Sequence, residues 1–360
     1  MINKTYEKYL LGDFLRIFLK VSLVFFSLII LLNILEEINF FKDENENTIL
    51  VPTILTFLNS PSLLFNIFPF IFFITTQFFF IKIIDNQEIQ ILKYYGITNL
   101  NIIKLLTLIS FLLSLILVVF FYNFSAKLKF KYLDIKNSYS NDDKYLATIT
   151  ENGMWIKDEI NNEYRIINAS KIENKYLLNV EILKFDKNFD LIQTIVSRKA
   201  NIETNQWILK DVKIVDKEKT SSEETVLFYS NFNSEKISKL FSDLSSLTYF
   251  ELKELKNNYQ KLGYTTIEVD SYLNTLYRYV FYSTLMTIFA SCIMLYIKRS
   301  RSKIFYIILG IFISVIIYYI NYITDTLGQN LNLSPIIVSL TPITLLTLIS
   351  LTQLISINEK

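Results

Sequence analysis

Six long apolar runs constrain this chain more than any other feature. A helix needs about 20 mainly apolar residues to cross a hydrocarbon layer of roughly 30 Å, and six stretches meet that requirement. The predicted membrane-spanning helices run approximately from Phe14 to Leu35, Leu63 to Ile84, Ile102 to Tyr122, Val280 to Ile297, Ile304 to Ile323 and Ile336 to Ile355. The first run is too long for a signal peptide, and no small-residue cleavage site follows it, so we expect a retained anchor.

The composition excludes several classes of function. Of the 360 residues, 51% are hydrophobic, and the net charge is only +2, so we expect no nucleic-acid partner. The chain has no His, and Cys292 is its single Cys. A His- or Cys-based metal cluster, a Ser-His-Asp triad and an intramolecular disulfide are therefore ruled out. We expect a chain without an enzymatic active site and without a bound cofactor.

Charged residues in the short loops predict the orientation, because Lys and Arg remain on the cytoplasmic side. The loop over residues 298–303 holds four basic residues and no acidic one. Residues 36–46 hold five acidic residues against Lys42 alone. Both termini are therefore predicted in the cytoplasm, and the long segment between the third and fourth spans is predicted outside the inner membrane.

That outer segment has a different pattern. We divide the chain into membrane helices over 1–124, an inserted domain over 125–270 and membrane helices over 271–360. Alternating residues between about 145 and 230 predict about seven to nine strands. The predicted fold is therefore a membrane α-helical protein, three spans plus three, with an inserted periplasmic all-β domain of sandwich or jelly-roll type.

One amphipathic helix is predicted after the strands, over about 248–262. Thr248 and Glu251 have the spacing of a capping box, and Gly263 follows the last apolar position. We expect this helix to lead back to the membrane.

A short cytoplasmic helix is predicted between the second and third spans, over about 85–96. Asp85 is expected to cap its start, Gly96 to end it, and Asn99 to cap the next span. Such a helix presents Glu88, Leu92 and Tyr95 on one face. An ordinary loop with a solvated acid is the alternative.

Several segments together resemble a known family. The stretch from Asn86 to Thr98, the strands at 153–158 and 207–212, and Gly328 with residues 333–335 and Pro342 are similar to the LptF/LptG permeases. These permeases belong to the ABC transporter that exports lipopolysaccharide. Where the family has a small residue pair before the glycine, this chain has Tyr94 and Tyr95. The phrase at 153–158 is more similar to the LptG type than to the LptF type.

The resemblance implies a role and a set of partners. It implies that residues 85–96 form the coupling helix of an inner-membrane permease subunit, and that Glu88, Leu92, Tyr95 and Gly96 meet the ATPase. The implied partners are a second permease half, a cytoplasmic LptB-like ATPase dimer, a bitopic LptC-like protein and lipopolysaccharide. The subunit would extract this lipid from the outer leaflet and pass it to a periplasmic β-jelly-roll bridge, while the partner binds and hydrolyses ATP.

Polar residues inside the spans are candidates for a substrate cavity. Asn33 stands where the family has a basic residue that meets a lipid phosphate, and Asn321 and Asp325 lie one turn apart on the fifth span. Asn66 and Gln77 in the second span, and Arg278 at the entry to the fourth, are also polar positions. Plain hydrogen bonding between helices is the alternative role for all of them.

Three other functions remain open from the residues alone. A membrane-anchored periplasmic sensor would not need a capped cytoplasmic helix. An intramembrane enzyme would need clustered acids or a Ser-Lys pair at one depth, and the sequence offers none. A permease half of another lipid or lipoprotein exporter would share the same layout, and the lipid it binds would distinguish it.

Overall fold

The computed structural model divides the chain into two compact units. Residues 1–129 and 267–360 form a helical unit, and residues 130–266 form a unit that contains all the strands described. The structure describes residues 2–42, 49–139, 154–160, 163–173, 175–187, 190–216, 219–234, 236–237, 243–262, 265–296, 303–330 and 335–358. Each unit is described by itself below.

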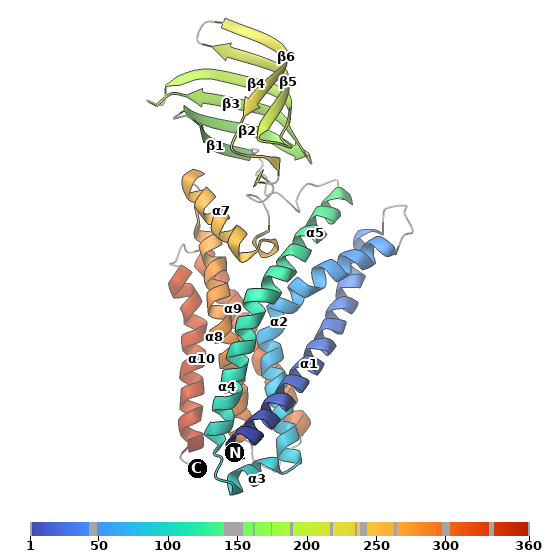
Figure 1. The fold of residues 1–360 in the computed structure, drawn as a ribbon, viewed down its shortest axis with the longest axis vertical. Helices are drawn as coiled ribbons and strands as arrows, with labels where there is room; N and C mark the ends of the chain where they lie inside the picture. Colours follow the sequence, from blue (N-terminus) through green and yellow to red (C-terminus); the bar gives the residue numbers. More distant parts are fainter. Residues whose placement is uncertain are drawn as a thin grey trace. The chain divides into compact units, whose positions relative to one another are not determined.

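The helical unit confirms the predicted spans. Its elements are α1 (Ile2–Phe40), α2 (Leu50–Asp85), α3 (Glu88–Tyr94), α4 (Asn99–Ile116), η1 (Leu117–Tyr122), the first part of α5 (Asn123–Tyr139), α8 (Ile267–Tyr296), α9 (Lys303–Asn330) and α10 (Pro335–Asn358) (Figure 1). Five of the helical segments described are long and apolar enough to cross a membrane, and the apolar part of α10 adds a shorter sixth. The chain is therefore a multi-pass membrane protein.

Helix α2 lies at the centre of the helical unit. It packs against α1, α8 and α9, and its side chains between Ile71 and Phe80 are almost all buried. Ring contacts fix it against α1, where Phe18 packs on Phe68 and Phe72. Pro61 and Pro69 lie inside α2, and Figure 1 shows this helix changing direction along its length. The aromatic residues of the second span thus form much of the core of this unit.

The third span contains a π-helical turn. Helices α4 and α5 continue one another through η1, in which hydrogen bonds join residues five apart. Tyr122 at its end is buried and packs between the rings of Phe65 and Tyr272, at centroid distances of 5.2 and 6.4 Å. Sequence periodicity predicted a regular helix here, because one extra residue in a turn does not disturb an all-apolar pattern.

The second unit contains an antiparallel sheet in which neighbours in sequence are neighbours in space. Its strands are β1 (Met154–Ile160), β2 (Glu163–Glu173), β3 (Tyr176–Phe185), β4 (Leu191–Asn201), β5 (Gln206–Asp216) and β6 (Lys219–Tyr229). The described residues thus hold six strands, fewer than the seven to nine predicted, because five of the runs continue for ten or eleven residues without a break. One face is apolar and buried, with Ile182, Ile195 and Trp207 among its side chains.

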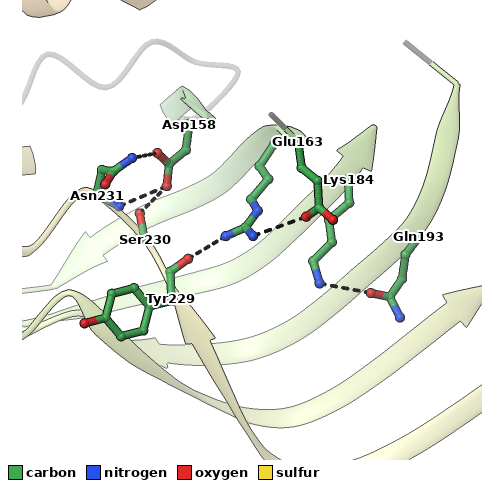
Figure 2. A network of polar contacts seen from close by, with 8 residues as sticks. Asp158, Glu163, Lys184, Gln193, Tyr229, Ser230 and Asn231 are labelled. Carbon is green, nitrogen blue, oxygen red and sulfur yellow. Dashed lines mark hydrogen bonds and ion pairs between the residues drawn. The ribbon is translucent and has the colours of Figure 1, made fainter. Parts of the chain in front are cut away.

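A polar network ties the two edge strands of this sheet together at one corner (Figure 2). The buried Asp158 of β1 accepts hydrogen bonds from Ser230 Oγ at 2.8 Å and from the backbone N–H and side-chain amide of Asn231, at 3.1 and 2.9 Å. Arg165 of β2 donates to the Tyr229 carbonyl at 2.7 Å. Since β1 and β6 are opposite edges in the strand order, these bonds require the sheet to curve, as an open roll does.

The inner side of the curved sheet near this corner also holds cations. The Arg165 guanidinium and the Lys184 ammonium lie over the Phe228 ring, at 5.2 and 5.8 Å from its centroid. Burial lowers the pKa of Lys184, and the positive charge of Arg165 lowers it further. Lys184 donates to Gln193 Oε1 at 3.1 Å, so strands β3 and β4 are also connected here.

The predicted helix after the strands is present as α7 (Tyr249–Leu262). Its capping box is confirmed, because the Thr248 N–H and hydroxyl both donate to Glu251 Oε2, at 2.9 and 2.8 Å. Gly263, predicted to end this helix, lies outside the described residues.

Candidate functional site

Helix α3 forms a short ordered segment between α2 and α4. Its end follows the prediction: Gly96 has φ +79°, its N–H donates to the Lys93 carbonyl at 2.9 Å, and the Ile97 N–H donates to the Leu92 carbonyl at 3.0 Å. This pair of bonds is a Schellman motif, in which the left-handed residue is most often glycine. The helix therefore stops at a fixed residue.

The predicted caps at its two flanks are wrong. Asp85 is the last residue of α2, and Gln87, with φ +57°, occupies the N-cap of α3 without a capping side chain. At the start of α4 the cap is Thr98, which accepts from the Asn101 N–H at 3.3 Å, whereas Asn99 is the first helical residue. Because a threonine in extended conformation can turn its hydroxyl toward the helix, the asparagine that follows is not needed as a cap.

Glu88 is held by neighbours on both sides. Its Oε1 accepts from the Tyr9 hydroxyl at 3.1 Å and from the Asn86 side-chain amide at 2.8 Å. Tyr9 belongs to α1, so Glu88 connects α3 directly to the first span. Its Oε2 atom is buried, and no hydrogen-bond partner for it lies in the described part of the chain. The carboxylate is thus only partly satisfied by the described residues around it.

The outward face of α3 is unusually apolar for a surface helix. Ile91, Tyr94 and Tyr95 are 55%, 87% and 65% exposed, and the two tyrosine rings pack edge to face. Leu92 is half-buried. Of the residues predicted on this face, Tyr95 is exposed and Leu92 lies partly underneath. Tyr94 and Ile91 were missed, although both are apolar positions on so short a helix.

An ion-pair cluster fixes α1 to α2 near α3. The buried Asp13 of α1 is paired with Lys82 of α2 and with Arg16 one turn further along α1, the latter at 3.3 Å. A buried carboxylate with two cationic partners resists separation, because removing one partner leaves uncompensated charge. The sequence did not indicate this cluster, since Asp13 and Lys82 are 69 residues apart.

A cavity of about 250 Å³ lies among α2, α8, α9 and α10. Its lining includes Thr275 and three larger polar side chains from three helices: Asn66 of α2, Arg278 of α8 and Asn321 of α9. Five tyrosines line it as well, namely Tyr272, Tyr279, Tyr282, Tyr318 and Tyr322. Asn321 was a predicted cavity residue, and Asn66 and Arg278 were noted only as polar positions. The structure brings all three to one place.

Pro69, which lines this cavity, leaves one backbone carbonyl of α2 without its helical donor. Because Pro69 has no N–H, the Phe65 carbonyl one turn earlier lacks its helical donor. The Tyr279 hydroxyl of α8 donates to that carbonyl at 2.5 Å, and the Phe65 and Tyr279 rings stack at 4.4 Å with an angle of 8°. A side chain of one helix thus completes the backbone hydrogen bonding of another, which keeps the interior of the bundle satisfied.

The other two predicted cavity residues stay predictions, because only one of their side chains is described. Asn33 is 2% exposed, donates to the Thr56 carbonyl at 3.3 Å and accepts from Asn59 at 3.4 Å, so its amide joins α1 to α2. Asp325 lies in α9, and its side chain is outside the described residues. The structure therefore groups Asn321 with the cavity and Asn33 with a helix contact.

Gln77 joins α2 to α9 on the side of the cavity nearer to α3. Its side-chain amide donates to the Tyr306 carbonyl at 3.0 Å, and it approaches Gly310 so closely that a Cβ there would lie 1.9 Å from Nε2. Gly310 therefore leaves room for the Gln77 amide, and a Cβ at this position would displace that amide from the Tyr306 carbonyl.

Among the described side chains, no three His, Cys, Asp or Glu residues lie close enough together to hold a metal ion. The features that stand out are an exposed apolar helix with a partly buried carboxylate, and an aromatic cavity with one arginine. A search of curated proteins finds no match to this chain. The family model "Lipopolysaccharide export system permease LptF/LptG" matches residues 8–356, nearly the full length, and so the chain belongs to the LptF/LptG family of lipopolysaccharide export permeases.

Proposed function

We propose that this chain is one half of an ABC-type lipopolysaccharide exporter and that α3 is its docking element for a cytoplasmic ATPase. The observation that carries the proposal is α3 itself. It is a seven-residue helix that Gly96 ends at a fixed residue, with three apolar or aromatic side chains exposed and Glu88 beside them. An unpartnered apolar face of this kind suits a groove on another protein.

The orientation follows from the charge of the loops. The basic residues at 298–303 support a cytoplasmic position for that side of the bundle. Helix α3 joins the second and third spans, so an even number of crossings separates it from that loop and it lies on the same side. The unit with the strands is inserted between the third and fourth spans and therefore lies on the periplasmic side of the inner membrane.

Glu88 is the residue on which docking depends. Its carboxylate lies on the same short helix as the exposed apolar residues, and a charge-assisted bond to a cation of the ATPase would be strong in a desolvated interface. Because Tyr9 holds the same carboxylate, movement of the ATPase is transmitted to α1 as well as to α3. The ATPase dimer binds and hydrolyses the nucleotide, and this chain contributes no catalytic group and binds no cofactor.

The membrane faces of α1 and α9 suit a second permease half. Leu23 and Leu31 on α1 and Phe312 on α9 are each at least 60% exposed. Two such halves would enclose a cavity for the lipid, open toward the outer leaflet. The curved sheet offers the lipid an apolar inner face, and a bitopic periplasmic partner with a similar β-domain receives it there.

The test is Glu88→Ala in the co-expressed complex, read as the amount of ATPase that purifies with the permease. Truncating one partner of a buried charge pair costs about 2 kcal/mol or more, so affinity should fall by about 30-fold. Gln90→Ala is the matched control, because Gln90 is an exposed residue of the same helix. Normal ATPase recovery and normal export with Glu88→Ala would refute the docking proposal.

A permease half for another lipid or a lipoprotein is the alternative, and the lipid that purifies with the chain separates the two. Recovery of lipopolysaccharide, an ATPase and a second six-span chain supports the proposal. Recovery of a lipoprotein in place of lipopolysaccharide supports the alternative.

A further inference from the structure

The three polar residues of the cavity lie at one level of the bundle. Arg278 lies about five helical turns before the end of α8 at Tyr296, and Asn321 lies about five turns after the start of α9 at Lys303. Asn66 likewise lies about five turns before the end of α2 at Asp85. These three helix ends are on the same side of the bundle. This common level agrees with the cavity, which the three side chains line together.

That level is the outer boundary of the hydrocarbon core. At a pitch of about 5.4 Å, five turns of helix span about 27 Å, and the hydrocarbon core is about 30 Å thick. The cavity therefore lies where the head groups of outer-leaflet lipids meet their acyl chains.

Arg278 is the cation of this level. Within the six predicted spans, the other basic residues, such as Lys20, Lys82 and Lys104, lie toward the cytoplasmic ends, and the lysines of α5, beginning with Lys127, lie beyond the outer end of the third span. The outer end of the first span is instead acidic, with Glu36 and Glu37. An arginine within a span is costly unless it faces protein, water or an anion. Its Nη2 donates to Thr275 Oγ1 at 3.3 Å, which orients the side chain along α8.

The remaining lining suits the head group of an amphiphile. Asn66 and Asn321 supply amide donors, and Tyr318 and Tyr322 present hydroxyl groups on flat apolar rings. A planar guanidinium matches the oxygens of a phosphate in a bidentate manner. The volume of about 250 Å³ accommodates a head-group fragment and excludes a whole lipid, so acyl chains would remain outside.

We propose that Arg278, with Asn66 and Asn321, forms a recess that binds a phosphate group of a lipid held in the outer leaflet. That this lipid is lipopolysaccharide rests on the proposed function, whereas the recess requires only an anionic phosphate at this level. The recess supplies the positive charge that α1 lacks near Asn33.

The test measures lipid affinity in the purified, detergent-solubilised complex. The probes are bis-phosphorylated lipid A, the same lipid with its phosphates removed, and phosphatidylglycerol. Arg278→Gln removes the charge, Arg278→Lys keeps it, and Lys104→Gln is the matched control at an exposed cation elsewhere in the spans. Asn321→Asp is a second variant, because it places a carboxylate in the recess and leaves Arg278 in place.

The expected result is a fall in affinity of about tenfold or more for phosphorylated lipid A in Arg278→Gln and Asn321→Asp. The dephosphorylated lipid should bind the wild type and both variants equally, and Arg278→Lys should lose about threefold or less. Lys104→Gln should bind like the wild type.

Two results overturn the inference: an equal loss for both forms of lipid A, or no loss for either form while the wild type binds them. Failure of the proposed function has a different signature. In that case neither form of lipid A binds the wild type, whereas phosphatidylglycerol binds the wild type more tightly than Arg278→Gln. This result would support the phosphate-binding recess and contradict lipopolysaccharide as its ligand.

Discussion

Replacing Tyr279 by Phe tests whether a side chain of α8 supplies the hydrogen bond that Pro69 cannot donate within α2. The change removes only the hydroxyl that donates to the Phe65 carbonyl at 2.5 Å, and it keeps the ring that stacks on Phe65. Since Pro69 offers that carbonyl no N–H, the acceptor would be left unsatisfied in the bundle interior. Such a loss costs about 1–3 kcal/mol, so we expect Tyr279→Phe to lower the free energy of unfolding by about 2 kcal/mol.

The decisive comparison repeats the change in a Pro69→Ala background. There the N–H of residue 69 can donate to Phe65, and Tyr279→Phe should cost only about 0.5 kcal/mol. Unfolding of the four variants in mixed micelles, titrated with sodium dodecyl sulfate, gives the coupling energy between the two sites. We expect a coupling energy of about 1.5 kcal/mol. Equal costs in the two backgrounds, within about 0.5 kcal/mol, would show that the hydroxyl does not replace the missing donor.

Four further changes have defined outcomes. Gly310→Ala should destabilise the chain by about 1–3 kcal/mol through its clash with Gln77, and Gln77→Ala should restore much of that loss, as measured in the same unfolding titration. Asp158→Ala leaves three donors without their acceptor, so the β-unit should lose about 2–4 kcal/mol and hydrogen exchange of β1 and β6 should rise; unchanged protection would contradict the network's role. Gly96→Ala should cost about 1–2 kcal/mol at the end of α3 and reduce ATPase recovery while membrane insertion stays normal. Tyr9→Phe should weaken coupling of ATP hydrolysis to export with little loss of ATPase recovery, and unaltered coupling would remove α1 from the proposed pathway.

The sequence predicted those features that depend on local pattern. The spans follow from run length, the end of α3 from Gly96, and the start of α7 from the spacing of Thr248 and Glu251. Each of these signals lies within one helix or one turn. The predicted cap at Asp85 failed because α2 continues through that residue, and tertiary packing of α2 decides how far it continues.

Features that join distant segments were invisible from the pattern. Asn66, Arg278 and Asn321 were each recognised as polar within a span, yet only the packing of α2, α8 and α9 shows that they share a cavity. The pairing of Pro69 with Tyr279 is of the same kind, since 210 residues separate a proline from the hydroxyl that compensates for it. Asn33 was predicted near substrate from the family pattern, and the structure places its amide between α1 and α2.

The π-helical turn at Leu117–Tyr122 has a consequence for how this span tolerates change in length. A π-turn holds one residue more than an α-helical turn, so deleting a single residue there would produce a continuous α-helix without breaking the hydrogen-bond ladder. Because the extra residue is accommodated within one turn, residues beyond the deletion would keep nearly the same angular position relative to those before it. The aromatic contacts of the span on either side of the turn, such as that of Tyr272 with Tyr122, would then be retained. The π turn therefore lets the third span differ in length by one residue while its outer part stays aligned with the aromatic residues around the cavity.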